Sequence, residues 1–382
     1  MTAVDVVVPC YNYARYLETC VASILGQEGV AVRVLIVDDC SSDETPAVAA
    51  RLAAQDSRVL VRRNEVNLGL IGTANGGLID WAEAPYSLLL SADDALTPGA
   101  LARATALLEN HPEVGFVFGA VVVFDLDPPS PVPAGSDSPD YRIVDGPALI
   151  AHICHHTNDV PTPTAVVRTE LQKRVGGYNP ATPHTSDMEM WLRLAAHAKV
   201  GVIQAAQGYY RVHGSNMSGA FFAQPTRDVR ERLAAAEQAM AAVGGRMTDF
   251  PRVLRTMRRI EAQRAYWRAG LAFEAGERSL GETYLRFAAA TDPSPLSATG
   301  FWSATAKRQV GAGAMQRLRR LAGRPGPDAA ILASRLRPSL ELTPGEVWGW
   351  WPDARPPGAG LTSDNSRTRE ARDLELASSA KA

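Results

Sequence analysis

The first third of the chain alternates between two hydrophobic periods, one typical of strands and one typical of helices. Short apolar runs predict buried strands at 4–9, 32–37, 58–62, 86–90 and 114–124. Between these runs, apolar residues recur every three or four positions, which predicts helices at 16–27, 45–55, 71–82 and 97–109, the last opening on Thr97-Pro98. Strands and helices that alternate through short connections indicate a parallel sheet with right-handed crossovers.

The pattern becomes less regular after residue 124 and then mainly helical. A loop is predicted at 125–140, followed by a helix at 147–153, a strand at 164–168, a helix at 187–197 and strands at 200–204 and 208–212. Helices are predicted at 227–242 and 251–290, and the stretch 265–293 is similar to a single tetratricopeptide-type hairpin. We expect an α/β domain at 1–224, a helical region at 225–295, a basic extension at 296–351 and a disordered tail at 352–382.

Composition and charge narrow the class of protein. The 382 residues carry a formal net charge of −2, which argues against a nucleic-acid partner because phosphate binding requires a basic surface. Residues 301–338 hold eight Lys or Arg against one acid, Asp328. This segment is either a solvated helix face or a peripheral contact with anionic lipid.

The lack of a visible targeting signal and the spacing of the cysteines favour a cytoplasmic protein. The first residues lead directly into a strand, and the longest apolar run, at 114–124, is too short to span a bilayer. The four cysteines have no CxxC spacing, so we expect reduced, mostly buried thiols. The basic segment adds the inner face of the cell membrane as a candidate location.

Acidic, aromatic and proline residues follow three predicted strands at the point where each ends. They are Pro9 and Tyr11 at the first strand, Asp38 and Asp39 at the second, and Asp93 and Asp94 at the fourth. The carboxyl ends of parallel strands share one edge of a sheet, where ligands bind. Paired carboxylates repel each other unless a cation or a hydrogen-bond donor meets them, and divalent cations take carboxylate and phosphate oxygens. Taken alone, the second acidic pair equally fits a helix cap.

In combination with further motifs, these residues give the chain a clear resemblance to one protein family. Over about residues 3–220 it resembles the family 2 glycosyltransferases. The resemblance rests on seven motifs in order, namely 9–12 (PCYN), 37–43 (VDDCSSD), 67–69 (NLG) with Asn75, 91–94 (SADD), 176–178 (GGY), 186–191 (SDMEMW) and 210–218 (YRVHGSNMS). It implies the GT-A fold, in which a mainly parallel nucleotide-binding sheet is flanked by helices, here followed by a helical C-terminal region.

The resemblance also implies an activity and its residues. The activity is metal-dependent, inverting transfer of a hexosyl group from a nucleotide-diphosphate sugar, usually a UDP-sugar, to an acceptor hydroxyl. The donor-binding residues it implies are Pro9, Tyr11, Asp38, Asp39, Asn75 and Asp93. Asp94 and His213 would hold Mn²⁺ or Mg²⁺, and Asp187 would be the catalytic base, since Ser186 stands where the family usually has a second acid.

The residues leave alternatives open. Tyr11 also fits core packing, Asp38 fits a residue that orders the turn, and Asn75 fits a helix cap. Asp187 also fits a helix N-cap, and His213 a purely structural role.

Two other functions compete with transfer. A nucleotidyltransferase needs a glycine-rich loop with a basic residue after the first strand, and 9–13 has neither. A non-catalytic nucleotide-sugar-binding or scaffolding protein stays open because of Ser186. If the chain is an enzyme, its partners are a nucleotide-sugar donor (dTDP and GDP sugars being alternatives to UDP) and a carbohydrate or lipid-linked acceptor, as in polysaccharide biosynthesis.

Overall fold

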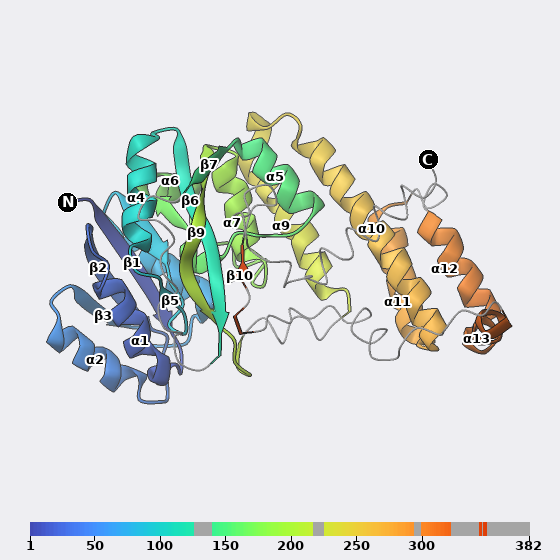
Figure 1. Cartoon of the computed structure of the whole chain (residues 1–382), viewed down its shortest axis with the longest axis horizontal. Helices are drawn as coiled ribbons and strands as arrows, with labels where there is room; N and C mark the ends of the chain where they lie inside the picture. The colour runs from blue at the N-terminus through green and yellow to red at the C-terminus, as the bar shows by residue number, and fades with distance from the viewer. Residues whose placement is uncertain (126–139, 217–224, 294–298, 322–343, 346, 350–382) are drawn as a thin grey trace. The chain divides into compact units, whose positions relative to one another are not determined.

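The computed structural model describes residues 1–125, 140–216, 225–293, 299–321, 344–345 and 347–349. The predicted disordered tail at 352–382 and nearly all of the predicted loop at 125–140 lie outside these residues. The chain divides into two compact units. The first consists of Met1–His213 and Gln238–Met247 with a short C-terminal segment, and the second is helical (Figure 1).

The first half of the sheet follows the predicted alternation. Its strands are β1 (Ala3–Cys10), β2 (Ala31–Asp38), β3 (Val59–Arg63) and β4 (Tyr86–Leu89), and its helices are α1 (Ala14–Leu25), α2 (Thr45–Gln55) and α3 (Gly69–Asn75). The four strands are parallel, in the order β3-β2-β1-β4. Seven of the eight residues of β1 are buried, as expected for a central strand covered on both faces.

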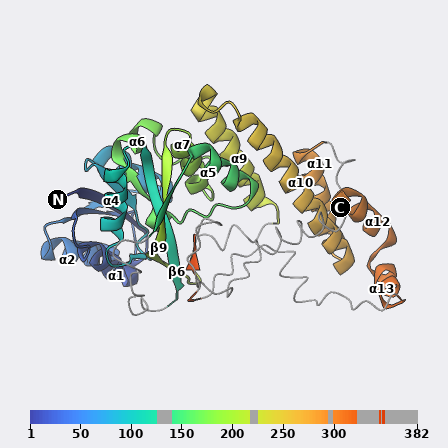
Figure 2. The same cartoon turned by 45° about the horizontal axis from the view of Figure 1, so that its top comes forward.

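The second half of the sheet is mixed. Its elements are β5 (Ala95–Leu96), α4 (Ala100–Asn110), β6 (Val114–Phe124), β7 (Tyr141–Val144), α5 (Gly146–His155), the 3₁₀ turn η2 (Thr162–Thr164), β8 (Val166–Arg168), α6 (Thr169–Val175), α7 (Ser186–Ala195), β9 (Lys199–Arg211) and β10 (Val347–Trp348). The strand order continues as β4-β8-β6-β9-β5, with β8 antiparallel to both of its neighbours and β6 parallel to β9. Figures 1 and 2 show β6 and β9 as long neighbouring arrows. The strands predicted at 200–204 and 208–212 are one strand, because register irregularities absorb the residues between them.

Two helices predicted in the first third of the chain differ from the expectation. The helix predicted at 71–82 is α3 followed by the π-helix η1 (Gly76–Trp81), where Gly77 lies so close to Val7 that a Cβ would clash. The helix predicted to open on Thr97-Pro98 begins at Ala100 instead. Pairing of β5 with β9 holds the chain in the sheet up to Leu96, and Gly99, with φ of 71°, makes the turn into α4.

The helical part contains α9 (Arg227–Val243), the 3₁₀ turn η3 (Gly244–Arg246), α10 (Phe250–Ala275), α11 (Arg278–Thr291), α12 (Thr299–Val310) and α13 (Ala312–Leu321). The helix predicted at 251–290 breaks at Gly276, whose φ of 83° closes α10 before α11 packs against it as a hairpin. Lys307 and Arg308 of the basic segment form ion pairs with Glu274 and Glu282. Within the described residues, no helix has the length and apolarity to cross a membrane.

Candidate active site

The loops after β1 and β2 are tied together at the carboxyl edge of the sheet. Asn12 has φ of 57°, a conformation that asparagine adopts more readily than most residues. Its Oδ1 accepts the backbone N–H of Ser42, and its own N–H donates to Ser41 Oγ at 2.9 Å. Tyr11, beside it, is 48% exposed, which contradicts core packing for this ring. Tyr11 is thus available to a ligand at this edge.

The two carboxylates that end β2 have different partners. Asp38 accepts the N–H of Ser41 at 3.0 Å and pairs with Arg63 at 3.4 Å, so it orders the turn, as the structural alternative proposed. Oδ1 of Asp39 accepts from Asn64 Nδ2 and from the N–H of Leu68, both at 2.8 Å. Oδ2 of Asp39 has no hydrogen bond among the described residues, so it is the oxygen of this carboxylate that can accept from a ligand.

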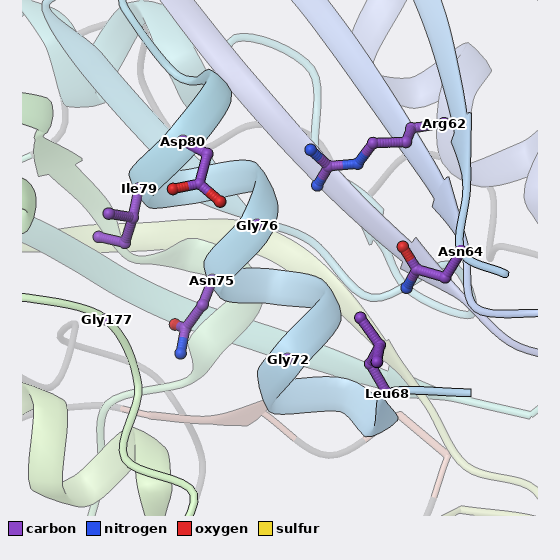
Figure 3. Close-up of a pocket in the computed structure, with 9 residues that line it drawn as sticks. All are labelled: Arg62, Asn64, Leu68, Gly72, Asn75, Gly76, Ile79, Asp80 and Gly177. Atoms are coloured by element: carbon purple, nitrogen blue, oxygen red, sulfur yellow. The ribbon is translucent and has the colours of Figure 1, made fainter. Parts of the chain in front are cut away.

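A hollow of about 570 Å³ lies beside these partners of Asp39. It is lined by Arg62, Asn64, Leu68, Gly72, Asn75, Gly76, Ile79, Asp80 and Gly177 (Figure 3). Asn75 points toward Gly177 and away from Arg62. Its Nδ2 donates to the carbonyl of Tyr178 at 2.9 Å, and its Oδ1 accepts the N–H of Tyr178 at 2.6 Å. The amide of Asn75 therefore holds the loop at 176–178.

The acidic pair after β4 is held by the end of β9. The N–H of Arg211 donates to Asp94 Oδ1 at 3.0 Å, and Nε of Arg211 donates to the carbonyl of Asp93 at 2.9 Å. The guanidinium is buried and lies over the rings of Tyr16, at 4.5 Å, and Phe124, at 4.3 Å. Arg211 thus fixes the position of both aspartates.

His213 joins the same cluster two residues later. Its Nε2 lies 3.1 Å from Asp93 Oδ2, and both side chains are almost fully buried. The imidazole stacks on Tyr16, with 5.1 Å between ring centroids, and meets Tyr13 edge-on at 5.5 Å. One imidazole and two carboxylates thus meet at the carboxyl edge of the sheet.

The electrostatics of this cluster favour a cation. Burial and the negative charge of Asp93 raise the pKa of Asp94 well above its ordinary value. Only Oδ1 of Asp94 accepts a hydrogen bond among the described residues. One or two carboxylates suffice to hold Mg²⁺ when substrate phosphates supply further oxygens, so the pair fits such an ion. The described residues contain no group of three or more His, Cys, Asp or Glu side chains that could hold a metal by themselves.

Asp187 lies in the first turn of α7 and is partly buried. Thr185 occupies the N-cap position, so Asp187 is not the N-cap residue. The N–H of Met188 donates to its Oδ1 at 2.6 Å, and Asn158 Nδ2 donates to its Oδ2 at 3.0 Å. Burial raises the pKa of Asp187, although these donors and the charge of His184 oppose the rise. A carboxylate with a raised pKa is suited to accept a proton.

The connection from Asn158 brings Asp187 toward the same edge as the acidic pair. Asn158 precedes η2 by four residues, and η2 packs against β4 and β5, which flank Asp93 and Asp94 in sequence. β8, which follows η2, runs antiparallel to β4, so the chain before β8 lies at the carboxyl end of β4. The predicted base is therefore joined, through Asn158, to the segment that leads into the edge of the sheet where the predicted metal residues lie.

Glu189, the other acid of this motif, is engaged elsewhere. It forms a buried bidentate pair with Arg193, with both N–O distances at 2.8 Å. Arg193 also donates to the carbonyls of Val175 and Gly177. These carbonyls lie just before Tyr178, whose backbone is hydrogen-bonded to Asn75. Glu189 thus serves structure, and of the two acids at 187 and 189 only Asp187 remains for proton transfer. No motif in the sequence assigns a role to Arg193, Asn64 or Asn158. The i,i+4 spacing of Glu189 and Arg193 was the visible signal for that pair.

Comparisons with known proteins agree with this geometry. Residues 5–170 match the model of the family described as glycosyl transferase family 2. An uncharacterized glycosyltransferase of Nostoc sp. is 28% identical over 56% of this chain and 66% of its own length. A GalNAc(5)-diNAcBac-PP-undecaprenol beta-1,3-glucosyltransferase of Campylobacter jejuni is 32% identical over 32% of this chain and 39% of its own length. The chain spans less than two thirds of the length of both relatives.

A solved structure has the same fold. TarS of S. aureus, residues 1–349 in complex with UDP-GlcNAc, superposes with a TM-score of 0.58 at 18% identity. The superposition covers 85% of this chain and 93% of that one. The predicted fold class, an α/β domain of GT-A type with a mainly parallel sheet, is confirmed.

Proposed function

We propose that this chain, which belongs to glycosyl transferase family 2 through its residues 5–170, transfers a glycosyl group from a nucleotide-diphosphate sugar to an acceptor hydroxyl. One observation carries the proposal. Asp187, a partly buried carboxylate with a raised pKa, is hydrogen-bonded to Asn158, and the chain from Asn158 leads into the carboxyl edge of β4, where the end of β9 holds Asp93 and Asp94 in place.

The donor is a UDP-sugar in this proposal. The exposed ring of Tyr11 stacks on the base, and the free oxygen of Asp39 accepts the N–H of uracil. Pro9 and Asp38 shape the turn beneath the base, and Asn75 supports the hollow from the other wall. TarS, which has the same fold, was solved in complex with UDP-GlcNAc, a donor of this class.

Asp94 and His213 would hold a divalent cation, with Asp93 beside them at the ribose or at the ion. Such an ion, Mn²⁺ or Mg²⁺, neutralises the charge that develops on the diphosphate leaving group. The protein's part is to keep the two carboxylates adjacent and oriented. Arg211 does this through its backbone N–H and its Nε.

The reaction is a single displacement with inversion. The acceptor oxygen forms a bond to the anomeric carbon while the bond from that carbon to the diphosphate oxygen breaks. The acceptor proton passes to a carboxylate oxygen of Asp187, and the nucleoside diphosphate leaves. The proton transfer requires Asp187 to be ionised before the acceptor binds, so activity rises with pH through the pKa of this residue.

The acceptor is a carbohydrate or lipid-linked glycan in this proposal. The Campylobacter relative is named for a polyprenyl-diphosphate-linked acceptor, which supports this class. An acceptor of that kind would place the enzyme at the inner face of the cell membrane. Lys307 and Arg308 form ion pairs within the protein, so they contribute less to a contact between 301–338 and anionic lipid. The remaining basic residues of the segment would have to make that contact.

Release of nucleoside diphosphate from a panel of UDP-, GDP- and dTDP-sugars, with and without Mn²⁺, tests the proposal. Asp187→Asn is expected to lower kcat by about 10²–10⁴-fold with little effect on donor binding, as for loss of a general base. Asp94→Asn is expected to weaken the Mn²⁺ dependence of donor binding and of turnover. Asp145→Asn is the matched control. Asp145 is an exposed acid that pairs with Lys199 at the start of β9, whereas Arg211 lies at the other end of that strand.

The scaffold alternative makes the opposite forecast. It holds if wild type, Asp187→Asn and Asp94→Asn all bind UDP-sugar and all release UDP at the same background rate. Thermal-shift measurements with each nucleotide sugar report that binding separately, because a ligand that binds the native state stabilises it.

A further inference from the structure

Asn158 has a fixed orientation against the carboxylate of Asp187. Its Nδ2 lies 3.0 Å from Asp187 Oδ2, and its Oδ1 accepts the N–H of Val160 at 3.4 Å. A rotated amide would set its oxygen against a carboxylate oxygen, which has no proton to donate. The amide therefore has only one orientation that satisfies both neighbours.

The two oxygens of Asp187 are thus held by different parts of the chain. Oδ1 accepts from Met188, within the same helix, whereas Oδ2 accepts from Asn158, which follows α5. The bond within the helix forms wherever α7 folds. The bond from Asn158 depends on tertiary structure, and it fixes the rotation of the carboxylate and favours its charged form.

We infer that Asn158 is a positioning residue, which orients Asp187 through a charge-assisted hydrogen bond and keeps it ionised for proton transfer. The inference rests on the proposed function. It goes further by naming the group that prepares the base before the acceptor binds. Asn158 itself gains and loses no proton.

Other groups near Asp187 can also titrate, and the test has to separate them. His184 precedes it by three residues and stabilises its negative charge. The phenol of Tyr178 faces it from the loop and has its own pKa raised, first by burial and then by the charge of Asp187. The elements that pack against α7 contribute His152 and His155 at the last turn of α5, and Lys173 and Arg174 on the exposed side of α6.

The experiment is the pH dependence of kcat/KM from about pH 5 to 9 for wild type, Asn158→Ala and Asn158→Asp. Loss of a hydrogen bond that favours the ionised carboxylate is expected to lower kcat/KM by up to about tenfold on the acid side of the profile. The midpoint of the acid limb is expected to rise by about one pH unit in Asn158→Ala. It rises further in Asn158→Asp, because two adjacent carboxylates resist joint ionisation. Donor KM stays unchanged, and activity recovers toward wild type at high pH.

Three controls make the result decisive. Repeating the series in a His184→Gln background shows whether the acid limb belongs to Asp187 or to the imidazole. Asn158→Ala combined with Asp187→Asn is expected to be no slower than Asp187→Asn alone, because the amide acts through the carboxylate. Melting temperatures identify any variant that loses activity by unfolding. Because Asn158 is only partly buried, both substitutions are expected to fold.

Two distinct failures can be told apart. Acid-limb midpoints that coincide in wild type, Asn158→Ala and Asn158→Asp overturn the positioning role, even if the variants are slower. An Asp187→Asn enzyme with wild-type turnover overturns the proposed function itself, whatever Asn158 does.

Discussion

The buried pair of Glu189 and Arg193 gives a quantitative test of how the site is supported. Arg193 is 6% exposed and Glu189 is 1% exposed. Replacing Arg193 with alanine leaves the carboxylate of Glu189 buried without its partner, a change that costs about 3–5 kcal/mol. The carbonyls of Val175 and Gly177 lose a donor as well, but these losses do not add fully to the first.

We expect Arg193→Ala to lower the free energy of unfolding by about 4 kcal/mol. That corresponds to a fall in Tm of roughly 8–16 °C at about 2–4 °C per kcal/mol for a domain of this size. Differential scanning calorimetry measures the change directly. The matched control is Arg174→Ala, which removes another i,i+4 pair, with Glu170, whose side chains are 55% and 93% exposed. An exposed pair of this kind contributes at most about 0.5 kcal/mol.

A double variant isolates the charge effect. Glu189→Leu with Arg193→Met removes both charges and keeps most of the volume, so it is expected to be far more stable than Arg193→Ala. Equal, small shifts in Tm for Arg193→Ala and Arg174→Ala would refute the assignment of a buried pair.

Two further expectations concern the first half of the sheet. Gly77→Ala is expected to lower the free energy of unfolding by about 1–3 kcal/mol through its clash with Val7, and Val7→Ala should restore part of that loss in the double variant, as read by Tm. Burial alone would raise the pKa of Asp5, but hydrogen bonds from Arg33 and from the N–H groups of Ala84 and Glu83 outweigh burial and lower it. Asp5 therefore stabilises the fold above its unfolded pKa of about 3.9 and loses this contribution as pH falls through the folded pKa. The Tm difference between wild type and Asp5→Asn should accordingly be large at pH 7 and small near pH 3; a gap that persists at low pH contradicts this linkage.

The strand-end residues could be predicted from the sequence because they depend on local pattern and one topological rule. Continuous apolar runs identify β1, β2 and β4, and parallel neighbours must present Tyr11, Asp39 and Asp93 at one edge. The predicted helix start at Thr97-Pro98 was wrong for a different reason. Pairing of β5 with β9 is a contact across more than 100 residues, and local propensity contains no information about it.

The partners of the site residues could not be predicted, for the same reason. Arg211 fixes Asp94 through a bond between residues 117 positions apart, and Asn75 holds Tyr178 across 103 positions. A motif identifies the residue type at each place but not whether its hydrogen-bonding groups are already occupied. Asn75 shows the consequence: the resemblance implies a donor contact, whereas both ends of its amide are engaged with backbone.

These long-range bonds give the site its rigidity. Helix α7 carries both Asp187 and Arg193, so the element that presents the proposed base also fixes the loop before Tyr178. Asn75 attaches that loop to α3, which forms one wall of the hollow beside Asp39. A shift of α3 would therefore be transmitted to α7 through the hydrogen bonds that the side chains of Asn75 and Arg193 make with the backbone of this loop. Because proton transfer requires the base to lie within about 3 Å of the acceptor hydroxyl, this rigid attachment between the donor side and the base is the feature of the fold on which in-line transfer would depend.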